Sequence, residues 1–217
     1  GLETSSAIDL TLRKRAGFVT GSLTVFHHAF DGFIYEQPTG RFAVEHEGEL
    51  EFVDADDPEA EEGLAIYRYV QQDAQFQGAE VELTFHLHDT ERSQLDLTLG
   101  GDLVRAENQQ TNTHLPRITP ARTKLGLQWA RDSLVIGSEV QFVGSQDRTA
   151  PGESKTDGYQ LINVSLSYRL PIGNESLTLF ARGTNLGNEE ARAHTSFLKE
   201  VAPLPGRNLN IGVRVSF

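Results

Sequence analysis

The sequence predicts an all-β protein, an antiparallel transmembrane β-barrel segment of about nine strands. Apolar and polar residues alternate over many segments, which places them on opposite faces of extended strands. Many of these segments come close to the roughly 9–11 residues with which a β-strand crosses an outer membrane. The connectors between the segments are short and long in turn. No stretch approaches the roughly 20 apolar residues of a membrane-spanning helix, so a helical membrane protein is excluded.

The alternation is clearest at the end of the chain. The apolar face there consists of Leu209, Ile211, Val213, Val215 and Phe217, and the polar face of Asn208, Asn210, Gly212, Arg214 and Ser216. The same period of two predicts further strands within residues 8–13, 20–35, 79–86, 95–103, 124–129, 136–142, 162–169 and 177–179. We expect the apolar faces to meet hydrocarbon and the polar faces to line an enclosed lumen.

The lengths of the connectors predict which end of the sheet faces outward. Short connectors lie near residues 14–18, 88–92, 131–133 and 171–174, and long ones near 36–69, 107–121, 145–158 and 185–207. Barrels with tight periplasmic turns and extended outer loops have this layout. A soluble β-sandwich that serves as a binding module is an alternative, but it has no reason to separate loop lengths by end.

An odd number of strands cannot close an antiparallel barrel, because the first and last strands would run in the same direction. Single-chain bacterial barrels of this type have an even number. We therefore expect further strands to precede Gly1. Since the chain has no methionine and no leader-like opening, we also expect any export signal to lie upstream.

Composition narrows the possible partners. The formal net charge is −12, and residues 45–62 hold much of the acidic excess without any Lys or Arg. We expect this run to be a solvated, mobile loop, and nucleic acid is not an expected partner because phosphate binding needs a basic surface. The chain has no cysteine, which excludes disulfides and thiolate metal sites.

The last strand resembles the C-terminal β-signal of outer-membrane proteins. The ending NIGVRVSF, residues 210–217, has a polar residue, a glycine two places on, and then apolar residues up to a terminal aromatic. The residues that carry this assembly signal are Asn210, Gly212, Val215 and Phe217. The resemblance implies that the barrel-assembly machinery recognises this strand by pairing with its edge.

Nearly the whole chain resembles TonB-dependent receptors. The block LFARGTNLGN at 179–188 is similar to their penultimate strand and its turn, and HTSFL at 194–198 with PGR at 205–207 to their last outer loop. Upstream, FDGFIY at 30–35, DAQFQGAE at 73–80 and LPRITP at 115–120 follow in the same order. The last blocks most resemble zinc-uptake receptors of the ZnuD type, which are themselves similar to haem receptors.

This resemblance implies an architecture and a function. Residues 1–217 would be the C-terminal portion of a larger, 22-stranded barrel, with the plug domain and the earlier strands absent from the sequence. The protein would lie in the outer membrane among its lipids, with its C-terminus in the periplasm. It would take up a scarce nutrient, zinc or a metal complex such as haem, without an intrinsic cofactor. The TonB energy complex would act through the plug.

Two outer connectors hold candidate metal ligands. They are His46, Glu47, Asp54, Asp56, Asp57 and His114. Imidazole with carboxylates can bind Zn²⁺, although a zinc site needs three or four converging ligands. In each case the competing interpretation is an ordinary polar loop residue. His194 resembles a family position in the last outer loop, where binding is possible.

The remaining histidine pairs are interpreted as structural. His27 and His28 are consecutive in a strand and so face opposite ways. His86 and His88 share a face but lie beside a short turn on the side expected to be periplasmic.

Two further alternatives compete with the receptor. A passive porin or adhesin barrel would lack the upstream plug and TonB box. An outer-membrane enzyme would need catalytic residues, but the sequence has no G-x-S-x-G, H-E-x-x-H or phosphate-binding glycine motif. We therefore expect no enzymatic activity.

Overall fold

The structure is a computed structural model that describes residues 1–173 and 175–216. One element is a short 3-10 helix, η1 (Pro58–Glu61). The strands are β1 (Thr4–Lys14), β2 (Val19–His46), β3 (Glu49–Asp54), β4 (Leu64–Asp89), β5 (Ser93–Asn108), β6 (Arg122–Arg131), β7 (Leu134–Val143), β8 (Tyr159–Ile172), β9 (Glu175–Thr184) and β10 (Asn208–Ser216). Phe217, the last residue of the predicted assembly signal, lies outside the described residues.

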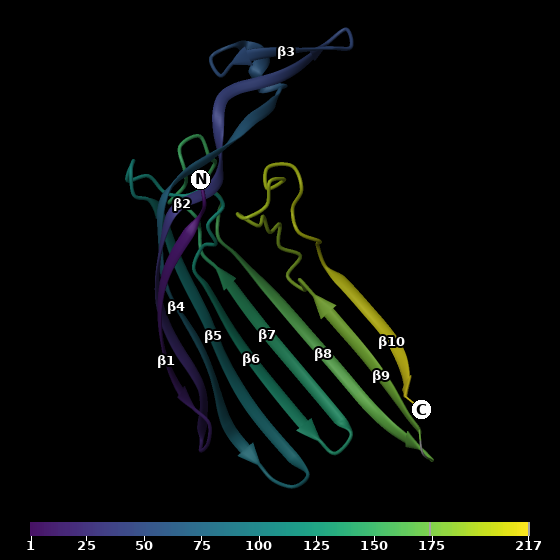
Figure 1. The fold of residues 1–217 in the computed structure, drawn as a ribbon. Coiled ribbons are helices and arrows are strands. Elements are labelled where there is room, and N and C mark those ends of the chain that lie inside the picture. The colour runs from purple at the N-terminus through teal and green to yellow at the C-terminus, as the bar shows by residue number, and fades with distance from the viewer. Residues whose placement is uncertain (174, 217) are drawn as a thin grey trace.

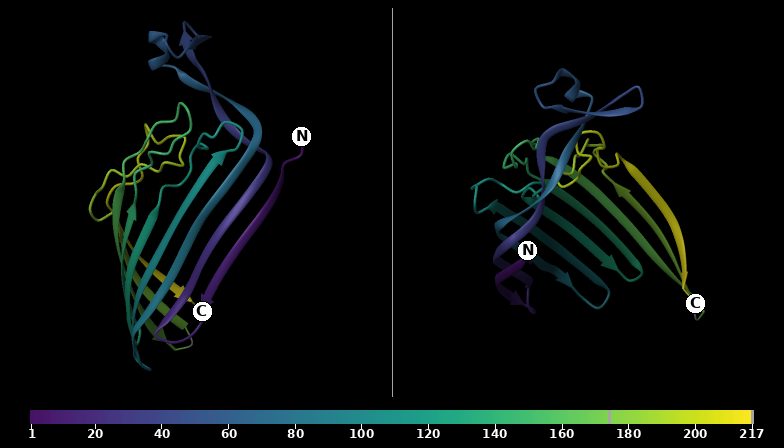
Figure 2. Two further views of the ribbon diagram at one scale, coloured as in Figure 1. Left: turned by 90° about the vertical axis from the view of Figure 1, so that its left-hand side faces the viewer. Right: turned by 45° about the horizontal axis from the view of Figure 1, so that its top comes forward.

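All strands belong to one antiparallel sheet. Its order is β1-β2-β4-β5-β6-β7-β8-β9-β10, and β3 pairs with β2 off this path. Figures 1 and 2 show the sheet curving into an open arc, with β1 and β10 at its two edges. The all-β antiparallel fold and the predicted strands are therefore confirmed, and the barrel is not closed within the part of the chain that is described.

The predicted long connector at residues 36–69 is wrong for most of its length. Strand β2 continues to His46 and β4 begins at Leu64, so that the two form an extended hairpin above the arc (Figure 1). Part of the acidic run is strand β3, in which Phe52 pairs with Ala43 of β2. The carboxylate of Asp57 then caps η1 by accepting a hydrogen bond from the backbone N–H of Glu59. The main-chain pairing of β3 and this cap give an ordered structure to a segment that is predicted to be a loop from its charge alone.

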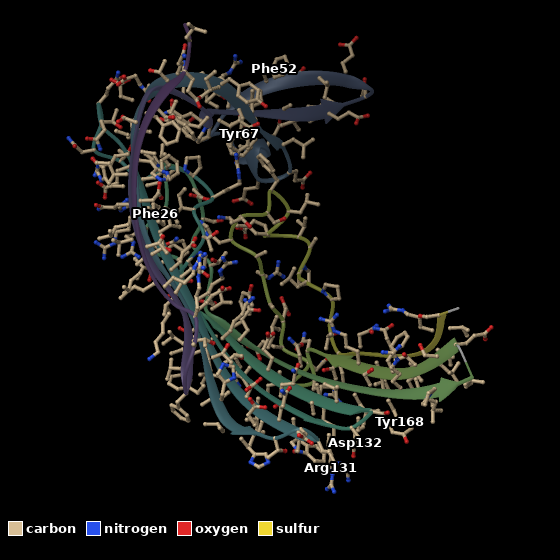
Figure 3. The ribbon with its side chains drawn as sticks, turned by 60° about the horizontal axis from the view of Figure 1, so that its bottom comes forward. Phe26, Phe52, Tyr67, Arg131, Asp132 and Tyr168 are labelled. Atoms are coloured by element: carbon tan, nitrogen blue, oxygen red, sulfur yellow. The ribbon has the colours of Figure 1, made fainter. Side chains whose placement is uncertain are left out.

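The strand register sorts the side chains into two faces, because directly paired residues share a side of the sheet. One row across five strands is wholly apolar: Leu83, Leu99, Leu125, Val140 and Ile162. The row one residue along is Thr84, Thr98, Gly126, Glu139 and Asn163, which is polar or small. Figure 3 shows Tyr168, a member of the apolar face of β8, on the outer side of the arc.

The apolar face is not covered by a second layer. Leu125 and Leu127 are 42% and 43% exposed, and Ile8 at the β1 edge is 70% exposed. The described strands form a single sheet, which contradicts the β-sandwich alternative because that fold packs its apolar faces together. No helix within residues 1–173 and 175–216 is long and apolar enough to span a membrane.

Buried apolar residues are few and gather where the arc meets the long loops. Ala74 of β4, Ala106 of β5 and Leu115 form the main cluster, and Phe30 and Phe76 pack against it. The cluster anchors the 109–121 loop to the sheet, so it positions the site described next.

Candidate functional site

The long connectors come together at one end of the sheet. They are the β2–β4 hairpin and three segments that we call the outer loops, residues 109–121, 144–158 and 185–207. Figures 1 and 2 show the 185–207 loop reaching back across the open side of the arc, below the hairpin. The short turns lie at the opposite end of the strands, as predicted.

An aromatic cavity of about 300 Å³ lies between the hairpin and the 109–121 loop. Its wall includes Phe33, Tyr35, Tyr69, Phe76, Leu115 and Arg117. The Phe33 ring is edge-on to Phe76 and stacked on Tyr35, with centroid separations of 5.2 and 6.2 Å. Ligand pockets are commonly apolar and aromatic with a few fixed polar groups, so this cavity suits the organic part of a ligand.

Buried Asn108 fixes one wall of this aromatic cavity. Its side-chain amide donates to the Tyr35 hydroxyl at 2.8 Å and also to Gln72, while Tyr35 donates to Gln72 at 2.7 Å. The carbonyl oxygen of the Asn108 side chain accepts from the backbone N–H of Gln110 at 2.8 Å. The network satisfies the buried polar atoms and holds the Tyr35 ring in one orientation.

Arg117 connects its own 109–121 loop to the β2–β4 hairpin and to the 185–207 loop. Its Nη2 donates to Glu36 Oε2 of β2 at 3.1 Å, and both side chains are mostly buried. Its guanidinium carbon lies 3.7 Å from the ring centroid of Phe197 in the 185–207 loop, a cation–π contact. Phe197 in turn meets Tyr67 of the hairpin edge-on at 6.4 Å. A hydrogen bond to Glu36, and then the charge of Glu36, raise the pKa of Tyr69 beside this group.

The carboxylate of Glu153 is a second meeting point, this time of all three outer loops. Its Oε1 accepts from the backbone N–H of Arg117 at 2.9 Å and from Lys199 Nζ at 3.1 Å. Its Oε2 accepts from the backbone N–H of Ala150 at 3.1 Å. Burial alone would raise the pKa of Glu153, but stabilisation by His194, Ala150, Arg117 and Lys199 outweighs it and lowers the pKa to about 2.

His194 completes this cluster and is fully buried. Its Nδ1 lies 3.0 Å from Thr156 Oγ1 and 3.4 Å from Lys199 Nζ. Its Nε2 is 3.1 Å from Glu153 Oε1 but is not aligned for a hydrogen bond, which leaves it unpartnered among the described residues. The Lys199 ammonium lies against both Glu153 and His194, the two side chains of the cluster that could bind a metal ion. Its positive charge would repel a cation. The cluster is therefore suited to holding loops together rather than to binding a metal ion.

The residues predicted as metal ligands do not converge. His46 Nε2 is 2.9 Å from Glu59 Oε2 at the hairpin tip, where the hydrogen bond and charge of Glu59 raise the pKa of His46. Asp54 lies 3.7 Å from Arg41, and His114 lies in another loop, 3.7 Å from Glu107. Glu47 occupies the turn before β3, and Asp56 and Asp57 lie before η1. Within the described ranges, no group of three or more His, Cys, Asp or Glu is arranged to hold a metal ion.

The polar face holds a second hollow of about 510 Å³ inside the arc. Its floor is small or polar, with Thr98, Gly126, Gly137 and Ser165, and its rim carries Glu139 and Arg182. His28 and His86 also lie on this face. The prediction that His86 and His88 share a face is wrong, because a β-bulge between them pairs His86 with Asp96 and His88 with Leu95, which point to opposite faces. His86 bonds Asp96 at 2.8 Å and Thr20 at 3.0 Å, and His28 lies 3.1 Å from Asp9. These contacts agree with a structural role for His86 and His28.

Residues 2–186 match the family described as TonB dependent receptor-like, beta-barrel. The chain belongs to this family. The predicted resemblance is thereby confirmed at the level of the family, which is one of TonB-dependent receptors and transporters of the outer membrane. The more specific likeness to ZnuD-type receptors is not part of this match.

Three solved structures have the same fold. Copper transporter OprC is similar with a TM-score of 0.68 and 20% identity, over 98% of this chain and 31% of its own. A variant of the ferric enterobactin receptor PfeA from Pseudomonas aeruginosa has a TM-score of 0.64 and 21% identity, over 99% of this chain and 31% of its own. The siderophore receptor PirA from Acinetobacter baumannii has a TM-score of 0.60 and 16% identity, over 98% and 31%. The chain thus spans about a third of the length of each.

Proposed function

We propose that the complete protein is an outer-membrane, TonB-dependent transporter that captures a scarce metal ion or metal complex with its outer loops. The observation that carries this proposal is the aromatic cavity with Arg117 at its rim, in a chain that belongs to the receptor family. The cavity lies at the end of the sheet where the long connectors meet, above the polar hollow inside the arc. A solute bound there would stand at the mouth of the lumen.

The membrane arrangement is part of the proposal. The exposed apolar rows would face lipid, and β10 would end in the periplasm and present its edge to the assembly machinery. Supporting this orientation, the short turns lie together at the end of the sheet away from the outer loops. The plug that couples transport to TonB would come from the part of the protein outside this sequence.

Two cargoes remain candidates, zinc and haem, and different features support each. The acidic hairpin with His46 would concentrate cations near the mouth. The aromatic cavity would instead contact a flat organic complex such as haem, which buries more apolar surface than a bare ion. The solved relatives are named for copper or siderophores, which is consistent with metal uptake in the broad sense.

Calorimetric titration of the complete receptor with zinc and with haem tests this proposal. Haem binding that weakens in Phe33→Ala, with zinc binding absent, would assign the cavity to an organic complex. Zinc binding that weakens in His46→Ala would assign the hairpin to ion capture. Glu91→Gln, in the short turn at the opposite end, is a control that should change neither. If neither zinc nor haem binds, uptake of these two cargoes is contradicted.

A further inference from the structure

One carboxylate holds together three loops that are far apart in sequence. Glu153 belongs to the 144–158 loop, its Oε1 accepts the backbone N–H of Arg117 from the 109–121 loop, and the same oxygen accepts from Lys199 of the 185–207 loop. Lys199 Nζ also donates to the backbone carbonyl of Ser154 at 2.8 Å. These bonds tie the 144–158 loop to each of the other two loops, so no single loop can move away without breaking at least one of them.

Burial makes these contacts costly to break. The side chains of Lys199 and Glu153 are 8% and 9% exposed, and His194 is fully buried. Losing one partner of a buried ion pair leaves the other charge without compensation in a poorly solvated site. The pairs on the loop surfaces differ in this respect. Glu190, which pairs with Arg192, is 69% exposed, and Lys155 and Asp147 are both 68% exposed.

The backbone at Arg117 supplies an independent observation. Its φ is +56°, in the left-handed region that costs a residue with a side chain free energy. Such a conformation persists where surrounding contacts fix it. The N–H of Arg117 is bonded to Glu153, and this conformation directs the guanidinium to Glu36 and onto the Phe197 ring. The aromatic cavity therefore has its arginine only while the 144–158 loop is in place.

We propose that Glu153 is a positioning residue whose buried carboxylate locks the 109–121, 144–158 and 185–207 loops into one body and holds Arg117 at the rim of the aromatic cavity. The outer loops then move together or not at all. The consequence for ligand capture rests on the proposed function, whereas the coupling of the loops does not.

Hydrogen exchange of the complete receptor in lipid nanodiscs, without ligand, tests the coupling. In Glu153→Gln the charge is lost but the size is kept, and we expect exchange to quicken about tenfold or more in all three outer loops. Strands β5 to β8 should keep their protection, which shows that the variant is folded. The matched controls Glu190→Gln and Asp147→Asn remove exposed carboxylates from the same loops and should change exchange there less than twofold.

A second pair of variants separates the links and serves if Glu153→Gln does not fold. Lys199→Met removes the hydrogen bonds of the Lys199 ammonium to Glu153 and Ser154 but leaves the Arg117–Glu153 bond, so the 185–207 loop should exchange faster while 109–121 stays protected. Ser154 donates to Glu200 between two of the loops, and the chain has no cysteine of its own. A Ser154→Cys, Glu200→Cys disulfide, placed in Glu153→Gln, should restore protection to 185–207 but not to 109–121.

The proposal is overturned if Glu153→Gln quickens exchange only in the 144–158 loop, or if the oxidised cysteine pair restores all three loops equally. Because no ligand is present in these measurements, their failure leaves the proposed uptake function standing. Conversely, a receptor that binds neither zinc nor haem can still show coupled loops.

Discussion

The ring of Phe180 in β9 occupies the space beside Gly212 in β10, its direct partner across the strands. A Cβ built at position 212 would lie 2.3 Å from the nearest ring atom, closer than any real contact allows. Gly212, which the sequence predicts to be part of an assembly signal, thus has a packing role in the folded sheet. An aromatic side chain laid over a cross-strand glycine also helps to fix strand register.

We predict that Gly212→Ala destabilises the barrel by about 1–3 kcal/mol, the usual cost of overpacking, because the Phe180 ring must move aside. The measurement is the temperature at which the folded band is lost in heat-modifiability gels of the complete receptor. Gly100→Ala is the matched control, since a Cβ there meets only Lys124 at 3.7 Å and should be tolerated.

A double substitution tests the cause. Adding Phe180→Ala should remove most of the penalty of Gly212→Ala, so that the two effects are clearly less than additive. Additive effects would mean that Gly212 matters for another reason, such as recognition during assembly.

The acid response of the outer loops should follow Glu153. Its pKa is lowered from 4.5 to about 2, so the stability it contributes is present in full above pH 4.5 and is lost as the pH falls through about 2. A spin label on Leu198→Cys should therefore stay immobile from pH 7 to about 4.5 and become mobile between there and pH 2. In Glu153→Gln the label should already be mobile at pH 7. A release above pH 4.5, or the same transition in both proteins, would contradict this assignment.

Arg117 should not be replaceable by lysine. Lysine keeps a positive charge near Glu36, but it lacks the planar group that lies 3.7 Å from the Phe197 ring centroid. Since a cation–π contact is worth about 0.5–2 kcal/mol, Arg117→Lys should speed chymotrypsin cleavage after Phe197 by roughly two- to thirtyfold. Arg117→Ala, which also loses the ion pair, should be cleaved faster still. Equal cleavage of all three proteins would show that the stacking does not restrain the 185–207 loop.

Asn185 should be sensitive to substitution although it touches no candidate ligand residue. It is 4% exposed with φ +48°, and its amide donates to the backbone carbonyls of Glu189 and Pro205 while its side-chain carbonyl accepts from Glu189 N–H. We expect Asn185→Ala to cost about 2–4 kcal/mol, from buried backbone groups left unpaired and from the strained φ. Asn185→Gly should cost less, because glycine accepts the φ. Urea unfolding of the complete receptor compares them, and equal losses would exclude the backbone contribution.

The strands could be predicted because each has apolar residues on one face and polar residues on the other, which gives the sequence a period of two. Segments such as 162–169 and 208–216 carry that period strongly, and both are strands. Strand β3 and the extensions of β2 and β4 could not be predicted this way. They project beyond the arc of strands that carry the alternation, and main-chain pairing with their neighbours stabilises them. Their acidic composition therefore indicated a loop.

The candidate site was much harder to predict. Glu153, Arg117 and Lys199 come from three loops without periodicity, and each is an ordinary charged residue in its local sequence. Only their burial against one another distinguishes them, and burial in loops is a tertiary property. For His194 only the resemblance to a family position indicates a role, and the structure places it in this cluster. The acidic hairpin and His114 stood out by composition, but their roles as metal ligands stay predictions.

The central claim is that the apolar face of the arc meets lipid and the polar face lines a lumen, and adjacent residues of one strand test it most directly. Single cysteines at Leu127 and Gln128 of β6, each carrying a nitroxide in the complete receptor in bilayers, would report collision with oxygen and with a water-soluble nickel chelate. We predict that the label at position 127 meets oxygen and is shielded from nickel, while the label at 128 shows the reverse preference. Free access of nickel to position 127 would contradict the account.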